Sequence, residues 1–324
     1  MPETAKNILA RHRESLHGTL QRKRIRSAAL GISKPYFVYE PPQLEALNQI
    51  PVLYLFRGHE REWINIDEDQ SRKKNTALED IDRMIAYGLI PPMVVVMPGL
   101  NSSNNWVPSL GIDMAGKWDR KFKGLGSGRF WRYLSRELLP PIEKHYPSCI
   151  NAPRLMAGFS LGGYTVSLLA TKMAGYFDHA AIYDGTLMWP DHCDPRIGKQ
   201  KNNDRIWCKN SLFHAALGQP RRDDVLRSWN TTEILQRAAG DDLRKLRRTM
   251  FWIASASRDG GLGNRDRSVA FVKLLQKMGI ATGFEKVIFD PEASHTWHWA
   301  DRFLVTFLLN AFGQKVSAVQ FVTE

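Results

Sequence analysis

The chain has 324 residues, of which 43% are hydrophobic, and a formal net charge of +12. This length can bury one large core, and no apolar stretch approaches the roughly 20 residues of a membrane-spanning helix. Residues 1–26 contain no signal-peptide core and the three cysteines suit a reducing compartment, so we expect a cytoplasmic protein.

The N-terminal third alternates between helix-like and strand-like segments. Residues 4–17 form a short basic helix or a loose arm, and we expect a basic N-terminal arm over 1–30 before a single domain over 31–324. Residues 93–97 are an unbroken apolar run, which is typical of a parallel strand buried on both faces. The other elements expected here are strands within 18–40, a strand over 51–57 and a helix over 76–87.

The loop after the strand at 51–57 supplies further candidate residues, Arg57, Gly58 and His59. Gly58 permits a turn that directs the N–H of His59 inward, as one donor to an oxyanion. Arg57 and His59 are equally well explained as residues that pack beside the site.

A long loop over residues 98–128 is rich in Gly, Asn and Trp. Loops of this length without regular structure are frequently functional. Trp106 and Arg129 are therefore candidates for lining a substrate pocket, although aromatic side chains in such a loop equally often pack against the core.

Residues 158–163 have the sequence GFSLGG, which contains the pattern G-x-S-x-G. The pattern lies between a strand-like segment, 152–157, and a helix-like one, 164–173, as in a nucleophile elbow. Such a turn presents the hydroxyl of Ser160 at the end of a sheet, and the N–H of Leu161 at the helix start faces a developing oxyanion.

The segment after the elbow changes character. A strand is expected over 178–184, but from 185 to about 248 the alternation of strands and helices is lost. Helix-like pieces over 209–217 and 231–238 lie among prolines and charges, so we expect a small helical cap insertion.

An acid and a histidine follow Ser160 in the order that a hydrolytic triad requires. A buried-strand pattern over 248–256 leads to Asp259, and an alternating strand-like segment over 282–289 leads to His295. A histidine can accept the serine proton, and a carboxylate can orient its imidazole.

Each partner of Ser160 has a rival in the sequence. Asp266 competes with Asp259, but it more naturally begins a helix over 266–278. His298 competes with His295, but it falls in the first turn of a final helix over 300–312, where its ring points elsewhere.

The chain resembles the esterase D-type putative esterase family of α/β-hydrolases over about residues 35 to 315. The resemblance rests on the strand ending at Arg57-Gly58, the helix over 130–147, the elbow over 158–163 and the Ser294-His295-Thr296-Trp297 motif. Relatives include S-formylglutathione hydrolases, feruloyl and siderophore esterases, and mycolyltransferases. The resemblance implies a mostly parallel sheet with helices on both faces. Arg57 departs from the His or Asp of the family, and Ala293-Ser294 replaces glycines.

The expected activity is hydrolysis of a small-molecule ester, with no cofactor and no metal. The same triad would serve an acyltransferase, and an inactive hydrolase scaffold that only binds ligands is a third hypothesis. Basic clusters at 22–26, 72–74 and 244–248 are typical of solvated faces and favour acidic partners. No nucleic-acid motif accompanies them, and the pattern leaves open whether the protein is a homo-oligomer.

Overall fold

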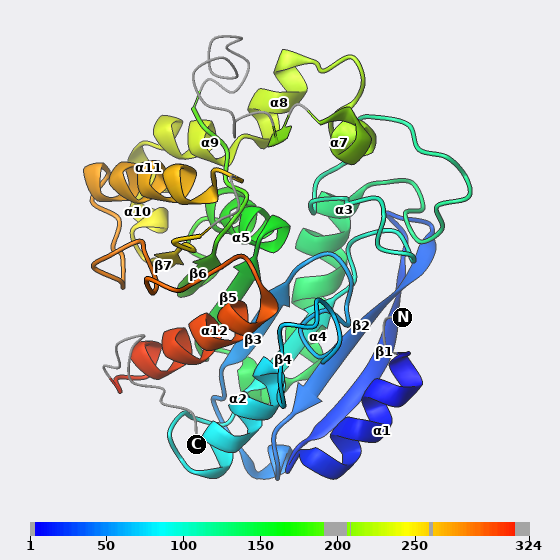
Figure 1. Ribbon diagram of the computed structural model, residues 1–324, viewed down its shortest axis with the longest axis vertical. Coiled ribbons are helices and arrows are strands. Elements are labelled where there is room, and N and C mark those ends of the chain that lie inside the picture. Colours follow the sequence, from blue (N-terminus) through cyan, green and yellow to red (C-terminus); the bar gives the residue numbers. More distant parts are fainter. Residues whose placement is uncertain (1–3, 191–205, 208, 259–261, 315–324) are drawn as a thin grey trace.

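A mixed sheet of seven strands forms the centre of the protein, with helices on both faces (Figure 1). The computed structural model describes residues 4–190, 206–207, 209–258 and 262–314. The strand order is β1-β2-β4-β3-β5-β6-β7. β2 pairs antiparallel with both of its neighbours, β1 and β4, and the remaining neighbouring strands pair parallel. The strands are β1 (Thr19–Ser27), β2 (Ile32–Glu40), β3 (Val52–Phe56), β4 (Val94–Pro98), β5 (Arg154–Phe159), β6 (His179–Tyr183) and β7 (Met250–Ala254). The predicted α/β class with a mostly parallel sheet is confirmed.

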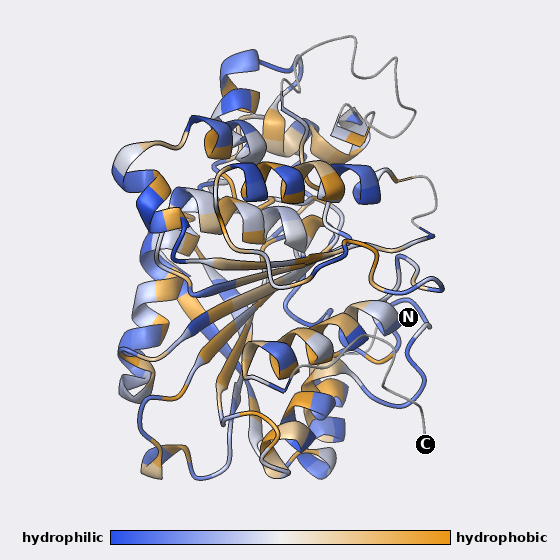
Figure 2. Cartoon of the chain, turned by 90° about the vertical axis from the view of Figure 1, so that its left-hand side faces the viewer, coloured by the Kyte–Doolittle hydropathy of each residue, from blue (hydrophilic) through white to orange (hydrophobic). Residues whose placement is uncertain are grey.

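The two faces of the sheet are covered by different helices, as the edge-on view shows (Figure 2). Side chains alternate along each strand, so Val94 and Val96 pack into one core while Val95 and Met97 pack into the other. One core includes residues of α3 (Phe130–Arg132), a π-helical turn η2 (Tyr133–Leu138), α4 (Leu139–His145), α5 (Leu161–Lys172) and α11 (Asn264–Lys277). The other core includes residues of α1 (Ala5–Ser15), α2 (Ala77–Ala86) and α12 (Trp297–Ala311).

Residues 4–30 contribute to this architecture. β1 pairs with β2 along its whole length, from Thr19 opposite Glu40 to Ser27 opposite Ile32, and forms one edge of the sheet. Ile8 and His12 of α1 are buried. The segment expected as a basic arm therefore contains a packed helix and the edge strand.

The segment over 282–289 is not a strand, and that prediction is wrong. It forms two isolated bridges: Thr282 pairs with Phe251 of β7, and Ile288 pairs with Ser255, the residue that follows β7. Between them Gly283 lies against the ring of Trp252, where an added Cβ would come within 2.3 Å of ring carbon Cε3. Five residues of this stretch, 283–287, lie between the two bridges, but only three, 252–254, lie between them on the β7 side, so the pairing is not a continuous ladder.

The segment between β6 and β7 contains four described helices: α7 (Asn210–Leu217), α8 (Asp223–Trp229), α9 (Thr231–Arg237) and α10 (Gly240–Leu246). A separate apolar cluster joins Phe213 and Leu226 of this segment to Tyr164 and Leu168 on α5. These helices thus cover the helix that follows Ser160, and their role as a cap stays a prediction. Among the described residues, no helix has the length and apolar character needed to cross a membrane.

Candidate active site

Ser160 lies in the tight turn between β5 and α5, with φ of 56° and ψ of −120°. A positive φ is uncommon outside glycine, and such strained conformations concentrate at functional sites. The turn depends on the absence of side chains around it. A Cβ on Gly162 would come within 2.0 Å of the carbonyl oxygen of Phe56, and one on Gly158 within 2.2 Å of that of Gly162.

His295 lies beside this turn and is paired with an acid that the sequence analysis did not single out. Its Nδ1 is 2.5 Å from Oδ2 of Asp184, which directly follows β6. The His295 ring also packs on Phe159, the residue before Ser160, with the ring centroids 4.6 Å apart. The structure therefore brings a histidine–carboxylate pair to the carboxyl end of the elbow strand.

Asp184 is fully buried and held by several donors. Its Oδ1 accepts hydrogen bonds from the Ser255 hydroxyl and, at 3.1 Å, from the Ala256 N–H, and its Oδ2 accepts from Asn264 Nδ2 at 3.1 Å. Burial by itself would raise the pKa of Asp184, but the hydrogen bond and charge of His295, with those of Ser255 and Asn264, lower it below its ordinary value. The carboxylate is therefore ionised and oriented toward the imidazole.

The backbone of Asp184 is also strained, with φ of 42°. Its N–H donates to the carbonyl of Ala254 on β7, and two residues later the N–H of Thr186 donates to the carbonyl of Ser160. The two strained residues are therefore fixed to each other through adjacent strands, since β5 and β6 pair side by side.

The predicted acid, Asp259, lies outside the described residues, so its position relative to His295 stays untested. Asp266 lies in the first turn of α11, as expected, where it is 4.0 Å from Arg265. His298 is the second residue of α12; its N–H donates to the Ser71 hydroxyl and its ring packs on Trp299.

A signal for Asp184 was present in the sequence. Functional side chains in open parallel sheets cluster where strands reach their carboxyl ends. Asp184 occupies this position on the strand that directly follows the elbow helix, but sequence order alone favoured an acid after the next strand.

The two predicted oxyanion donors are in different situations. Leu161 is the first residue of α5, where backbone N–H groups have no partner within the helix. The His59 N–H donates to Oε1 of Glu62 at 2.6 Å, and the Gly58 N–H donates to the same oxygen at 3.1 Å. His59 can therefore serve an oxyanion only if that carboxylate moves away.

Glu62 also connects this loop to the other predicted substrate residues. It accepts from Asn105 Nδ2 at 3.0 Å, and its Oε2 is 3.5 Å from Arg57 Nε. The Arg57 guanidinium lies over the Phe159 ring, 5.5 Å from its centroid, and so reaches the neighbourhood of Ser160.

The remaining predicted pocket residues lie further out. Trp106 is 74% exposed, and its backbone N–H donates to the Ser102 hydroxyl at 3.1 Å. Arg129 is exposed at the start of α3, opposite Asp113 in an isolated bridge. Both residues can contribute only to the rim of a site.

A buried ion pair links the loop after β3 to the helix after His295. Arg72 donates to both carboxylate oxygens of Asp301 on α12, at 2.6 and 2.8 Å. It also donates to the carbonyls of Glu62 and Asn65, and its guanidinium lies 4.5 Å from the centroid of the Trp297 ring. These contacts hold the Glu62 loop and the start of α12 in one arrangement.

We expect Arg72→Met to lower the free energy of unfolding by about 3–5 kcal/mol, because it leaves a buried carboxylate without its partner. Burial raises the pKa of Asp301 to about 6 even with Arg72 present, so this group depends on its partner when ionised. Urea unfolding measures the loss. The double variant Arg72→Met/Asp301→Leu, which removes both charges, should recover most of it, and a loss below about 1 kcal/mol in the single variant would show that the pair is dispensable.

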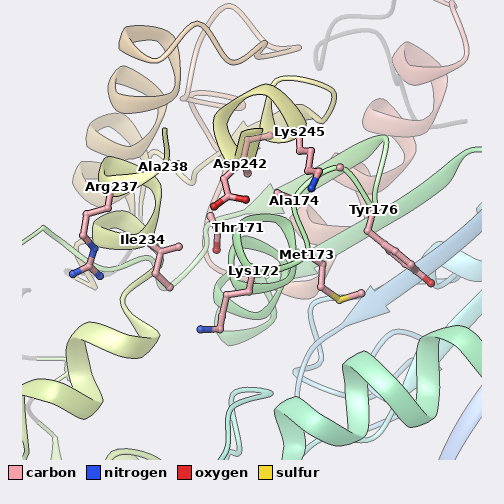
Figure 3. Close-up of a pocket in the computed structure, with 12 residues that line it drawn as sticks. Thr171, Lys172, Met173, Ala174, Tyr176, Ile234, Arg237, Ala238, Asp242 and Lys245 are labelled. Carbon is pink, nitrogen blue, oxygen red and sulfur yellow. The ribbon is translucent and has the colours of Figure 1, made fainter. Parts of the chain in front are cut away.

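An open cleft of about 770 Å³ lies at the other end of α5, lined by Thr171–Tyr176 and by residues of α9 and α10 (Figure 3). Since α5 has 12 residues, at a rise of about 1.5 Å each this cleft is about 18 Å along the helix from Ser160. Its cations have partners of their own: Lys245 with Asp241 at 2.7 Å, Arg237 with Glu233 at 3.8 Å, and Lys172 with the Ser228 carbonyl at 3.3 Å. The cleft is therefore not part of the Ser160 site.

Comparison with known proteins gives the family of the chain. The model of the family described as putative esterase matches residues 27–258. A curated relative, the endo-1,4-beta-xylanase/feruloyl esterase of Xylanibacter ruminicola, is 26% identical in an alignment 210 residues long that covers 61% of this chain. That match spans 26% of the relative, so the chain corresponds to about a quarter of its length.

Solved structures show the same fold. A ferulic acid esterase superposes with a TM-score of 0.63 at 19% identity, covering 92% of this chain and 98% of the other. An S-formylglutathione hydrolase from Agrobacterium tumefaciens gives a TM-score of 0.62 at 15% identity, covering 96% and 98%. The α/β-hydrolase fold expected from the sequence is thus confirmed.

Proposed function

The chain belongs to the putative esterase family, and we propose that it is a serine hydrolase that cleaves a carboxylic ester through an acyl-enzyme on Ser160. The observation that supports the mechanism is the pairing of His295 Nδ1 with Asp184 Oδ2 at 2.5 Å, next to the strained turn at Ser160. Asp184 takes the role of the triad acid in this proposal.

The reaction proceeds in two acyl transfers. His295 accepts the proton of the Ser160 hydroxyl as its oxygen attacks the ester carbonyl carbon, and then gives that proton to the leaving alcohol. Water, deprotonated by the same histidine, attacks the acyl-enzyme, and the proton returns to Ser160 as the carboxylic acid leaves. Asp184 fixes the Nδ1–H tautomer, so that Nε2 of His295 is the basic nitrogen.

The oxyanion of each tetrahedral intermediate needs two donors. The Leu161 N–H at the start of α5 is one, supported by the positive end of the helix dipole. The second is the His59 N–H, released when the Glu62 carboxylate turns toward the Arg57 guanidinium, 3.5 Å away. Substrate binding thus couples to the Arg57 and Glu62 pair in this proposal.

The substrate is a small-molecule ester. The similar curated protein is named for feruloyl ester cleavage, so hydroxycinnamate esters are the first substrates to assay. An acyltransferase with the same triad would differ in accepting a hydroxyl group in place of water; product analysis in the presence of alcohols distinguishes the two. The cytoplasmic location stays a prediction.

A fluorophosphonate probe tests the enzyme proposal. We expect the native protein to form one covalent adduct, found at Ser160 by peptide mass spectrometry, because only an activated serine attacks the phosphorus. Heat-denatured protein and the Ser160→Ala variant are the controls and should stay unlabelled. If the native protein also stays unlabelled, the hydrolase proposal is wrong and a binding scaffold is favoured.

A further inference from the structure

We propose that a basic pocket beside the loop after β3 binds an anionic oxygen group, a carboxylate or a phosphate, that the ester substrate carries; this inference rests on the hydrolase activity proposed above. The pocket has a volume of about 390 Å³. Its walls come from the β1–β2 hairpin and from the loops after β3 and β4, and its charged and titratable residues are Arg22, Arg24, Lys34, His59 and Glu60.

Positive charge exceeds negative charge in this pocket. Three cationic side chains, Arg22, Arg24 and Lys34, face a single carboxylate, Glu60. That carboxylate accepts from Arg22 Nη2 at 2.8 Å, and its other oxygen is 2.9 Å from His59 Nδ1. Burial opposes its ionisation, but the hydrogen bonds from His59 and Arg22 lower the pKa of Glu60 to about 2. Glu60 is therefore ionised and already shared between two partners.

The other two cations lie against neutral groups. Arg24 Nη2 donates to the carbonyl of Ser33 at 2.9 Å. Lys34 is 97% buried and donates to the carbonyls of Asn101 and Gly124, at 2.8 and 2.9 Å. Burial and the repulsion of Arg24 lower the pKa of Lys34 to about 8, against the attraction of Glu60. A bound anion would compensate this excess of positive charge.

The pocket lies at the same end of the sheet as Ser160, where β3, β4 and β5 reach their carboxyl ends. Phe56 of β3 is opposite Gly158 of β5, and Tyr36 of β2 is opposite Pro98 of β4. β2 is three strands away from β5, so at about 4.8 Å per strand the pocket is about 14 Å from the elbow across the sheet. His59 belongs both to the pocket and to the predicted oxyanion loop. A substrate whose acid group and ester are separated by this distance spans both sites.

Matched neutral and anionic esters test the proposal. In one arm the acid is on the acyl side. Here p-nitrophenyl half-esters of dicarboxylic acids, from succinate to dodecanedioate, are compared with p-nitrophenyl esters of uncharged acyl chains of equal length. In the other arm the acid is on the alcohol side. Here acetates of phenols that carry a side chain ending in a carboxylate or phosphate are compared with acetates of phenols without that group. We expect the longer anionic esters to have at least tenfold higher kcat/KM than their neutral partners in one arm, with the preference falling as salt is added.

Arg24→Gln should reduce the anionic-to-neutral ratio of kcat/KM about tenfold, the loss expected from removing one charged hydrogen-bond partner. Arg26→Gln is the matched control, because Arg26 is exposed on the same face of the same strand and lies outside the pocket; its ratio should equal that of the wild type.

If neither arm shows an anionic preference while the acetate is cleaved in a Ser160-dependent reaction, the pocket proposal is overturned and the hydrolase proposal stands. If no ester is cleaved, inorganic phosphate binding measured by calorimetry separates the two. Binding that Arg24→Gln weakens supports the pocket, and its absence overturns it.

Discussion

Ser160→Ala is expected to reduce kcat for ester hydrolysis about 10⁵-fold or more, because the variant has no oxygen to attack the carbonyl and no acyl-enzyme can form. The fold should be intact, since Ser160 is held in place by backbone hydrogen bonds: its N–H to Tyr183, and its carbonyl from Gly163 and Thr186. Initial rates with p-nitrophenyl acetate and thermal unfolding of the same preparation measure both effects.

The control for this variant is a serine in the same region with no place in the mechanism. Ser167 lies on α5, buried, and donates to the carbonyl of Tyr164 on its own helix. Ser167→Ala should retain most of the activity at a modest loss of stability. Activity of Ser160→Ala within tenfold of the wild type would show that another group is the nucleophile.

Asp184→Asn is expected to lower kcat about 10³- to 10⁴-fold, through the wrong tautomer of His295. An asparagine amide facing Nδ1 donates a hydrogen bond to it, which favours the tautomer with its hydrogen on Nε2, the nitrogen that must be free to act as the base. The carboxylate also stabilises the imidazolium that forms when Ser160 loses its proton, and the amide cannot do so. Single-turnover kinetics with the acetate ester isolates this step from deacylation.

Asp259→Asn is the matched comparison, because Asp259 is the acid that the sequence order favoured. If Asp184 is the triad acid, Asp259→Asn should retain activity within about threefold. The opposite pattern, a severe loss in Asp259→Asn and near-normal rates in Asp184→Asn, would return the role to Asp259 and make Asp184 a structural residue. Comparable losses in both would indicate that the two carboxylates share the histidine.

Stability gives a second readout of Asp184. Its pKa is lower in the folded protein than its ordinary value, so its ionisation stabilises the fold at neutral pH. That contribution is fully present above the unfolded pKa and is lost as pH falls through the folded value. Asp184→Asn should therefore flatten the decline in stability on the acid side.

Much of this protein was determined by local sequence. Alternating and unbroken apolar runs predicted β3, β4 and β5, and the glycines around Ser160 predicted the strand-to-helix turn, because only residues without a Cβ fit between Phe56 and the helix start. These features are fixed by neighbours in the chain. Periodicity, turn chemistry and steric exclusion act over a few residues, so they can be deduced from the order of residues alone.

The tertiary structure decided which side chains meet. The pairing of β6 between β5 and β7 places Asp184 against His295, although the two are 111 residues apart. The stretch after α11 meets β7 and its continuation only at two separated bridges, so it does not extend the sheet although its residues alternate as in a strand. Each outcome depends on a choice among chemically equivalent partners. That choice follows from distance and burial in the folded chain, and not from residue type or order.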